Sequence, residues 1–364
     1  MKRDKYKEHV KLLDYLTNVI FIVAFVVFLC RNRVSIWDMI IFKDMASNMS
    51  LIEFLQNYSS WTSRYILQAI LYIVIKSPFF IFVILTIIIS EVAMYVFKKY
   101  SKCNEYLSII INISLTLFPN KILIEAGLEN VVINYVWVFC FFIISIIPLF
   151  CIIWRNSYND ISKILIIICT IIAANMEQMA GILVGLYTLA ILYEALYKKS
   201  RIDWMIILLL LISVISLILH LINSGNTGRY MLSIETYFPT YNNYNFLDKL
   251  WLSYYTTVNF LFGNFRLYVL LFLILLSIYT YLHEKRFNQY VALSVVPIIY
   301  YIFTFATKVI DKICKTAYQE IHEGMILDRV SDLINYPTAK VLHIVFFTSL
   351  ILILTVLFIR LRLI

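Results

Sequence analysis

Apolar stretches of about 20 residues recur along the whole chain, and they constrain the fold more than any single motif does. Each is long enough to cross about 30 Å of hydrocarbon as a helix. Only 15% of the 364 residues are charged, whereas about a quarter are charged in a soluble chain. Lipid explains the missing charge, because it is a solvent that does not demand charged groups. The sequence therefore predicts an all-α integral membrane protein.

Clusters of basic residues between the apolar stretches predict the topology. Lysine and arginine gather at the amino terminus, at 98–102 and at 198–201, which we expect on the cytoplasmic side. The pattern predicts about ten transmembrane helices in one polytopic domain over 1–364, with both termini cytoplasmic. We expect the first span to stay in the membrane, because no small-residue cleavage site follows it. The expected spans include 15–31, 106–118, 164–174, 204–221 and 339–358.

Four longer segments are expected on the opposite side of the membrane, where they can converge on one extracytoplasmic surface. Their ranges are 34–77, 119–132, 222–266 and 307–338. Apolar residues at helical spacing predict short interfacial helices at 49–58 and 61–75 in the first segment. An alternative treats 65–97 as two crossings, but it inverts every later loop and places the next basic cluster outside.

Several functional classes are disfavoured by composition and motifs. The formal charge of +9 does not indicate a nucleic-acid partner, because the basic residues lie in short clusters between apolar stretches. No CxxC pair, no histidine pair at metal-ligand spacing, no nucleotide-binding loop and no GxSxG motif is present. We therefore expect neither a metal nor a cofactor. Glu91 is expected to be an interhelical partner, and His220 stands alone.

The first outer segment contains the candidate catalytic groups. Asp38 and Asp44 lie shortly after the first span, and Glu53 and Arg64 follow among aromatic residues. A carboxylate at the membrane surface can take a proton from an attacking hydroxyl within hydrogen-bonding reach. Asp38 and Asp44 are therefore the candidate bases. The alternative interpretation is that both carboxylates simply face water in a polar loop.

Two arginines lie where a lipid phosphate would be. Arg64 and Arg229 fall at the expected outer interface, and arginine binds phosphate through a planar fork of donors. The stretch 223–228 predicts a flexible polar turn with backbone amides open to an anion. Asn226 lies within this stretch, and Arg229 directly follows it. These three residues are the candidate phosphate ligands. For Arg229, snorkelling towards headgroups is an equally good interpretation.

Polar and aromatic residues also gather where the second outer segment enters a helix. Glu129 and Asn134 can bind sugar hydroxyls, while Tyr135 and Trp137 offer flat faces to a sugar ring. An aromatic belt with a helix cap explains them equally well. Glu177 falls at the turn between two strongly apolar helices, where ionisable groups are usually functional or paired. Glu177 therefore joins the candidate residues for binding the sugar or the acceptor, and the alternative is a short exposed turn.

The order of these residues along the chain is more informative than any one motif. The relevant stretches, which span about half of the chain, are Trp37-Asp38, Trp61-Thr62-Ser63-Arg64-Tyr65, Gly127 with Asn134-Tyr135-Val136-Trp137, Asn175-Met176-Glu177-Gln178, and Ser224-Gly225-Asn226 with Arg229. In this order the chain resembles bacterial multi-spanning glycosyltransferases of the GT-C type, similar to serotype-converting glucosyltransferases and related membrane families. Such proteins often have paired acids where this chain has Trp37-Asp38, and Pro-Gly-Asn where it has Ser224-Gly225-Asn226. The first departure leaves open whether Asp38 or Asp44 is the catalytic acid.

The resemblance implies a sugar donor on polyprenyl phosphate and a glycan or glycolipid acceptor. Transfer would take place at the outer face of the bacterial cytoplasmic (inner) membrane, without a metal and with inversion at the anomeric carbon. A first-loop aspartate would act as base, while Arg229 and Arg64 stabilise the departing lipid phosphate.

Three other functions fit parts of the pattern. A polysaccharide polymerase would also use outer-loop arginines, but it needs no aspartate next to the first span. A transporter or flippase of lipid-linked oligosaccharides usually has ionisable residues at mid-membrane and a repeated half, and no repeat is visible here. A structural membrane protein without a site predicts that the outer segments diverge in space.

Overall fold

The fold is given by a computed structural model of the chain. It describes residues 2–33, 38–101, 103–117, 123–124, 127–154, 159–199, 201, 203–237, 239, 241–250, 252–253, 267–314, 353 and 356. Contacts within the chain divide it into two compact units, Met1–Arg229 and Tyr230–Ile364. Every candidate site residue named above belongs to the first unit.

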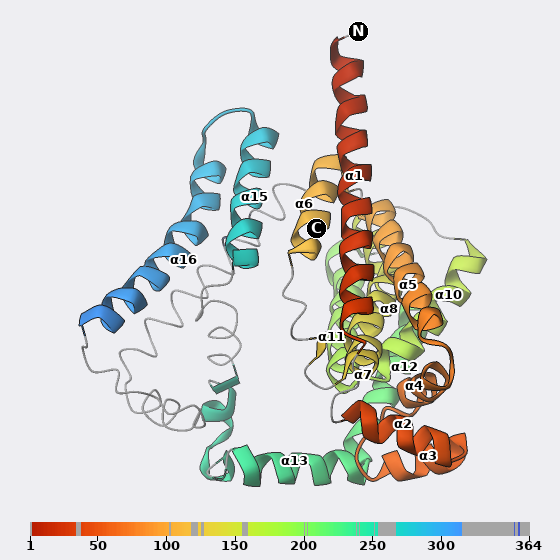
Figure 1. Cartoon of the computed structure of the whole chain (residues 1–364). Coiled ribbons are helices and arrows are strands. Elements are labelled where there is room, and N and C mark those ends of the chain that lie inside the picture. Colours follow the sequence, from red (N-terminus) through yellow and green to blue (C-terminus); the bar gives the residue numbers. More distant parts are fainter. Residues whose placement is uncertain are drawn as a thin grey trace. The chain divides into compact units, whose positions relative to one another are not determined.

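Helices build the described part of the first unit, and no strand occurs in that part (Figure 1). The helix bounds are α1 Lys2–Arg31, α2 Asp38–Asn48, α3 Leu51–Ser59, α4 Tyr65–Lys76, α5 Phe79–Tyr100, α6 Glu105–Thr116, α7 Leu128–Val131, η2 Val132–Trp137, α8 Val138–Ser145, α9 Ile147–Trp154, α10 Asp160–Ala174, α11 Glu177–Leu192, η3 Tyr193–Lys198, α12 Trp204–Ile222 and α13 Ser224–Tyr237, which continues into the second unit. η2 and η3 are π-helical turns within longer helices.

Five of the described helical segments are long and apolar enough to cross a membrane. They are Glu8–Arg31, Phe79–Tyr100, Leu128–Trp154, Glu177–Lys198 and Trp204–Ile222. Helices α4 and α6 are apolar but have only 12 residues each, which is short for about 30 Å of hydrocarbon. The prediction of an α-helical membrane protein is confirmed at this level, while the count of about ten spans stays a prediction.

Helix α12 shows why lipid is the solvent of these helices. Its inner face is buried and includes Leu209 and Ser213, both 0% exposed. Its other face presents Leu211, Ile215 and Leu219, each about half exposed and spaced four residues apart. Water would penalise such a continuous apolar face, whereas hydrocarbon does not.

The first outer segment is helical for most of its length. The expected interfacial helices at 49–58 and 61–75 correspond to α3 and α4. Helix α3 begins at a capping box, in which the Ser50 side chain accepts from the Glu53 N–H and the Glu53 carboxylate accepts from the Ser50 N–H. These hydrogen bonds lower the pKa of Glu53. Helix α2 was not expected, because the polar residues in 38–48 suggested a loop.

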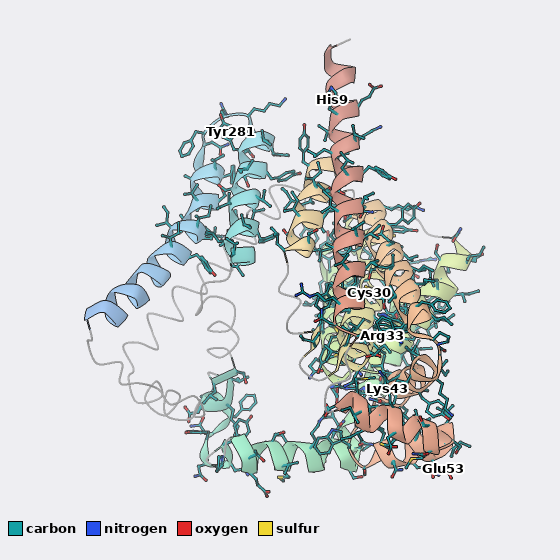
Figure 2. The ribbon with its side chains drawn as sticks, viewed as in Figure 1. His9, Cys30, Arg33, Lys43, Glu53 and Tyr281 are labelled. Atoms are coloured by element: carbon teal, nitrogen blue, oxygen red, sulfur yellow. The ribbon has the colours of Figure 1, made fainter. Side chains whose placement is uncertain are left out.

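These short helices lie at one end of α1. Figure 2 shows His9 at the opposite end of α1 from Arg33 and from Lys43 of α2. A helix rises about 1.5 Å per residue, so the 30 residues of α1 span about 45 Å. The basic amino-terminal end of α1 and the polar helices α2 and α3 are therefore separated by more than the thickness of the hydrocarbon core.

Polar contacts join α1 to its neighbours α5 and α6. Asp14 of α1 forms an ion pair with Lys98 of α5 at 3.6 Å and accepts from the Asn112 amide of α6 at 3.2 Å. The Asn18 amide donates to Glu91 of α5 at 3.0 Å. The prediction that Glu91 is an interhelical partner is therefore confirmed.

Three expected elements have different bounds in the structure. The first helix starts at Lys2, well before the expected 15. The helix expected at 164–174 already begins at Asp160, because Asn159 caps it by accepting from the Ser162 N–H. The segment expected outside at 307–338 is helical as far as Cys314, where α16 ends. The rest of that segment and nearly all of 339–358 lie outside the described residues.

The second unit contains a helical hairpin, α15 Leu267–Glu284 and α16 Gln289–Cys314. The two helices pack against each other, and the hydroxyls of Ser277 and Ser294 lie 2.9 Å apart across their interface. A residue with positive φ, Lys285 at 57°, lies in the turn between them.

Gly127 fixes the approach of α7 to α2, and we expect it to tolerate no side chain. Its φ is +88°, and a Cβ placed on it would lie 2.1 Å from Cγ of the buried Met39. Gly127→Ala should therefore lower the free energy of unfolding by at least about 2 kcal/mol. Gly181, inside α11, is a matched control, because a Cβ there meets no atom within 4 Å and alanine favours helix by about 1 kcal/mol. Thermal unfolding of both variants in detergent checks this, and equal midpoints would contradict it.

Candidate active site

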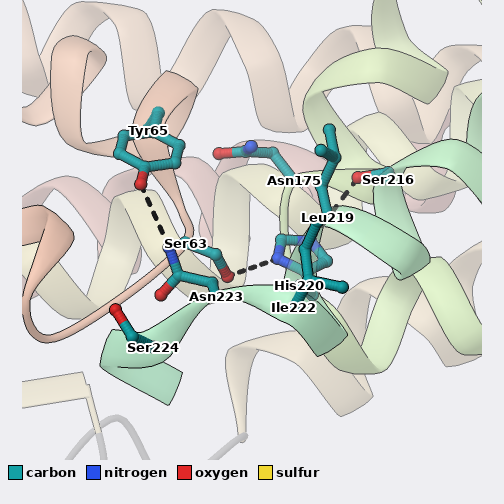
Figure 3. A pocket seen from close by; sticks show the side chains of 9 residues that line it. All are labelled: Ser63, Tyr65, Asn175, Ser216, Leu219, His220, Ile222, Asn223 and Ser224. Carbon is teal, nitrogen blue, oxygen red and sulfur yellow. Dashed lines mark hydrogen bonds between the residues drawn. The ribbon is translucent and has the colours of Figure 1, made fainter. Parts of the chain in front are cut away.

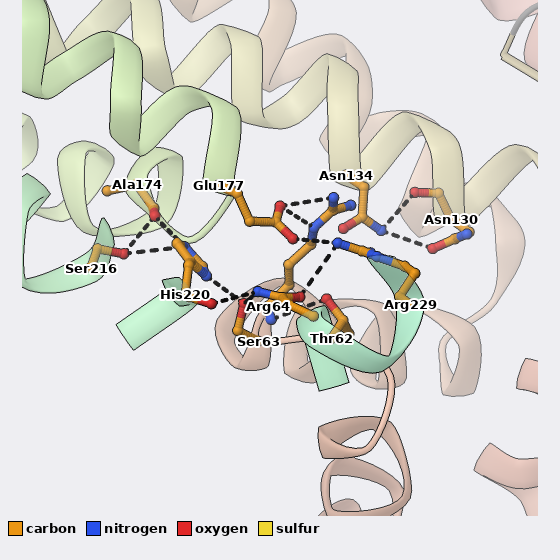
Figure 4. A network of polar contacts seen from close by, with 11 residues as sticks. Thr62, Ser63, Arg64, Asn130, Asn134, Ala174, Glu177, Ser216, His220 and Arg229 are labelled. Atoms are coloured by element: carbon orange, nitrogen blue, oxygen red, sulfur yellow. Dashed lines mark hydrogen bonds and ion pairs between the residues drawn. The ribbon is translucent and has the colours of Figure 1, made fainter. Parts of the chain in front are cut away.

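A continuous polar network lies between the ends of the apolar helices of the first unit (Figure 4). It connects residues that are far apart in the sequence, from three turns. The first turn, 60–64, joins α3 to α4; the second, 175–176, joins α10 to α11; and the third surrounds Asn223, between α12 and α13. The sequence predicted several of these residues separately, and the structure brings them together.

The centre of the network is Glu177, whose carboxylate is held by two arginines. Oε2 of Glu177 lies 2.9 Å from both Nε and Nη2 of Arg64, and Oε1 lies 2.6 Å from Nη2 of Arg229. The side chains of Arg64 and Glu177 are mostly buried, at 10% and 19% exposed, whereas that of Arg229 is 30% exposed. Two guanidinium groups against one carboxylate leave a formal charge of +1 at this place.

Backbone geometry places Arg64 in this position. The N–H groups of Trp61 and Thr62 both donate to the Tyr58 carbonyl at the end of α3, which turns the chain sharply towards α4. Arg64 directly precedes α4, and its side chain does not cap that helix. Instead the Asn175 side chain accepts from the Leu67 N–H at 3.1 Å, which is the role of an N-cap supplied from another turn. The guanidinium of Arg64 is therefore free to reach Glu177.

Glu177 is positioned by the start of its own helix. It is the first residue of α11, where the helix dipole favours a negative charge. The turn before it is tight, because the N–H groups of Asn175 and Met176 donate back to the last turn of α10. The interpretation of Glu177 as a paired group at a turn agrees with this geometry.

Arg229 reaches the site because α13 begins in contact with the first turn. The side-chain oxygen of Asn223 accepts from the Asn226 N–H at 3.2 Å and so caps α13. A Cβ on Gly225 would lie 2.5 Å from the Ser59 carbonyl oxygen, so only glycine permits this approach. The expectation of a flexible turn at 223–228 is wrong, since this stretch is the first turn of a helix packed on α3 and its loop.

Asn226 connects the arginines to a second part of the network. Its amide nitrogen donates to Ser63 Oγ at 2.7 Å and to the His220 carbonyl at 2.9 Å. Its side-chain oxygen faces Nη2 of Arg229 at 3.4 Å. Both ends of the amide are thus assigned by their partners. Asn226 lies beside one of the two arginines and fixes its orientation.

His220 is the residue of this site that the sequence did not reveal. It is only 3% exposed, and its Nδ1 lies 2.5 Å from Ser63 Oγ while its Nε2 lies 2.9 Å from the Ala174 carbonyl oxygen. A carbonyl oxygen accepts only, so Nε2 carries a proton, and in the neutral ring Nδ1 accepts from the Ser63 hydroxyl. The only signal in the sequence was a lone histidine at the end of an apolar stretch.

A cavity of about 360 Å³ opens beside Ser63 and His220 (Figure 3). Leu219 and Ile222 of α12 contribute apolar surface to its wall. The side chain of Asn223 donates to the Tyr65 hydroxyl at 3.0 Å across one side. The hydroxyl and amide groups that line the cavity belong to Ser63, Tyr65, Asn175, Ser216, Asn223 and Ser224.

The predicted sugar-binding residues near α8 have structural partners. Glu129 is 5% exposed and forms an ion pair with Lys43 at 3.3 Å. Trp137 of η2 is buried against α5, and its Nε1 donates to Oγ1 of Thr86 on that helix at 3.0 Å. These contacts agree with a packing role for both side chains. A contact of either residue with a sugar stays a prediction.

Two other residues of this group differ in exposure. Tyr135 is 47% exposed and presents its ring at the surface. Asn134 is 3% exposed, and its amide nitrogen donates to the carbonyl and to the side-chain oxygen of Asn130. The side-chain oxygen of Asn134 is buried and has no hydrogen-bond partner among the described residues.

The candidate bases lie on α2, outside the hydrogen-bonded network. Asp38 is exposed on the first turn of α2, and its partner in the motif, Trp37, lies outside the described residues. Burial and, to a smaller extent, the charge of Asp38 raise the pKa of Tyr58, which places this carboxylate near the end of α3. Asp44 is also exposed and accepts from the Asn48 side chain at 3.0 Å. Among the described residues, Asp38 is therefore the less engaged of the two carboxylates.

The chemistry of the network suits an anion next to a neutral polar ligand. Two guanidinium groups can share a phosphate in place of the Glu177 carboxylate. Carboxylate and phosphate both present pairs of oxygen acceptors to the paired N–H donors of a guanidinium group. No group of three His, Cys, Asp or Glu side chains with metal-binding geometry occurs in the described part of the chain.

Comparison with known proteins found no matching family, no matching curated protein and no matching solved structure.

We expect Glu177 to stabilise the packing at this end of the helix bundle. Glu177→Gln removes the carboxylate that the buried Arg64 and the partly exposed Arg229 share, so we expect a loss of about 1–3 kcal/mol in the free energy of unfolding. Glu235→Gln removes an exposed carboxylate on α13 and is the control, with an expected change within about 0.5 kcal/mol. Denaturant unfolding of the purified variants in detergent measures both values. A Glu177→Gln variant as stable as the control would show that the ion pairs contribute little.

Proposed function

We propose that this protein is a membrane glycosyltransferase of the GT-C type that moves a sugar from a polyprenyl-phosphate donor to a glycan or glycolipid acceptor. One observation carries the proposal. Arg64 and Arg229, which lie 165 positions apart in the sequence, meet at Glu177 beside a polar cavity. A phosphate site next to a pocket for a neutral polar group is what a lipid-phosphate sugar requires.

The finer topology is part of the same proposal. The chain would lie in the bacterial cytoplasmic membrane with about ten spans and both termini in the cytoplasm. The network and helices α2 and α3 would then face the extracytoplasmic side. The separation of His9 from Arg33 and Lys43 along α1 supports opposite sides for the amino terminus and the site.

The proposed reaction is a single in-line displacement. The acceptor hydroxyl attacks the anomeric carbon, the bond from that carbon to the phosphate oxygen breaks, and its electron pair remains on the departing phosphate. Arg64 and Arg229 stabilise the negative charge that develops there. A first-loop carboxylate, Asp38 or in its place Asp44, takes the proton of the attacking hydroxyl. One inversion results, and no metal is needed to balance the charges.

The role of the aspartates can be measured on cell-envelope glycans. We expect cells that express the wild-type chain to add a sugar to their envelope polysaccharide, and Asp38→Asn to reduce this addition by about 10²-fold or more at equal membrane abundance. Asp44→Asn is the matched control on the same helix and should retain most of the addition. The readout is sugar composition and mass of the purified glycan. If the two variants exchange behaviour, Asp44 is the base; if both retain full addition, neither is.

The role of the arginines can be separated from snorkelling by keeping the charge. Arg229→Lys preserves one positive charge but loses the planar fork, so we expect about a tenfold loss of sugar transfer. A snorkelling side chain would be replaced by lysine without loss. Arg201→Lys, at an exposed arginine between η3 and α12, is the control. Transfer rates in isolated membranes with saturating acceptor give the comparison, and full activity of Arg229→Lys would argue against phosphate binding.

A transporter or flippase for lipid-linked oligosaccharides is the second candidate, and one observation favours it. Asp14 and Glu91 are partly buried where α1 contacts α6 and α5, and one oxygen of Glu91 is buried without a hydrogen-bond partner in the described structure. Ionisable groups inside a helix bundle are typical of transport pathways. In the glycan measurement, transport would change the amount of lipid-linked intermediates, and a polymerase would change polymer length, without a new sugar.

A further inference from the structure

The cavity beside His220 has a composition that specifies a class of ligand. Its polar wall consists of hydroxyl and amide groups and the His220 imidazole, and none of the side chains that line it is a lysine, arginine, aspartate or glutamate. Leu219 and Ile222 add apolar surface, and Tyr65 presents an aromatic ring (Figure 3). A neutral sugar ring matches such a wall, because its hydroxyl groups can meet the polar side chains and its apolar face can meet the aliphatic and aromatic ones.

The size of the cavity suits one ring. Its volume is about 360 Å³, near the lower end of the range of about 300–1,000 Å³ that small-molecule sites occupy. A single monosaccharide unit fits this volume. The cavity also lies next to the arginine network, because Ser63 precedes Arg64 and Asn226 links Ser63 to Arg229.

Ser63 has one hydrogen-bonding position left for a ligand. A hydroxyl provides one donor and two acceptor sites. The donor is directed at His220 Nδ1, and one acceptor site receives the amide of Asn226. The remaining acceptor site of Ser63 can take a hydrogen bond from a sugar hydroxyl in the cavity.

We propose that this cavity is a subsite for one neutral sugar unit, in which Ser63 accepts a hydrogen bond from a sugar hydroxyl and His220 orients Ser63. The inference deepens the proposed function and rests on it for the origin of the sugar, which belongs to the donor or to the acceptor. His220 is a positioning residue, since it acts through Ser63. The tautomer that the Ala174 carbonyl imposes is what keeps Nδ1 available as an acceptor.

Binding is tested on the purified full-length chain in lipid nanodiscs, by saturation-transfer NMR. The probes are methyl glycosides of glucose, galactose, mannose, rhamnose and N-acetylglucosamine. We expect at least one to bind, Ser63→Ala to weaken it about fivefold, and Ser224→Phe, at the exposed edge of the cavity, to abolish it. Ser47→Ala, on the exposed face of α2, is the control. The proposal is overturned if no glycoside binds, or if binding is the same in Ser63→Ala and Ser224→Phe as in the wild type.

The orienting role of His220 has a separate readout. Glutamine can accept from Ser63 and donate to the Ala174 carbonyl, as the neutral imidazole does, whereas leucine can do neither. We therefore expect His220→Leu to weaken glycoside binding about fivefold, as Ser63→Ala does, and His220→Gln to retain most of the binding. Equal binding in His220→Leu and the wild type would overturn this role.

Transfer kinetics identify the source of the sugar and keep the two proposals distinct. In isolated membranes, Ser63→Ala should raise KM for the substrate, donor or acceptor, whose sugar occupies the cavity, with a smaller effect on kcat. If transfer proceeds with both KM values unchanged in Ser63→Ala and Ser224→Phe, the subsite is wrong and the transferase stands. If glycosides bind as expected but no sugar is transferred, the proposed function is wrong and the subsite stands.

Discussion

The ion pairs that Glu177 makes with Arg64 and Arg229 are the interaction on which this end of the structure depends. Arg64 directly precedes α4, Arg229 is the sixth residue of α13, and Glu177 begins α11. Three helix ends of mixed charge cannot meet in a poorly hydrated place unless their charges are paired, because an isolated buried charge is very costly. The Glu177 carboxylate thus allows the two guanidinium groups to lie close together. The same geometry makes the place attractive to a phosphate, which can take over the role of the carboxylate.

A second constraint follows from the first. The approach of α13 to the loop after α3 requires Gly225, since a Cβ there would clash with backbone atoms. Once α13 is held in this position, Asn226 reaches Ser63, Ser63 reaches His220, and His220 reaches the end of α10. Charge pairing on one side and a neutral hydrogen-bonded chain on the other divide the site into two parts of different chemistry. This division is the physical basis for assigning an anion to one part and a neutral sugar to the other.

Sequence patterns predicted the helices better than they predicted the site. The apolar stretches at 204–221 and 106–118 correspond closely to α12 and α6, because length and hydrophobicity are local properties. Arg64, Glu177, Arg229 and Asn226 were each predicted as candidates from residue type and position, and the structure brings all four together. Helix α2 and the helical start of α13 were missed. Polar residues suggested a loop at both, and glycines did so as well at the start of α13. There an Asn223 cap and packing against the end of α3 stabilise a helix.

The sequence by itself determined that this chain is helical and apolar enough for a membrane, because a helix that lies in hydrocarbon needs apolar residues along its whole length. It also determined which charged residues stand at the ends of helices. Only the tertiary structure decided which of these ends meet. It paired Glu177 with two arginines, determined the tautomer of His220 and its hydrogen bond with Ser63, and placed the cavity beside them. Such contacts join positions up to 163 residues apart, and no local pattern encodes them, because each depends on how three turns pack at once.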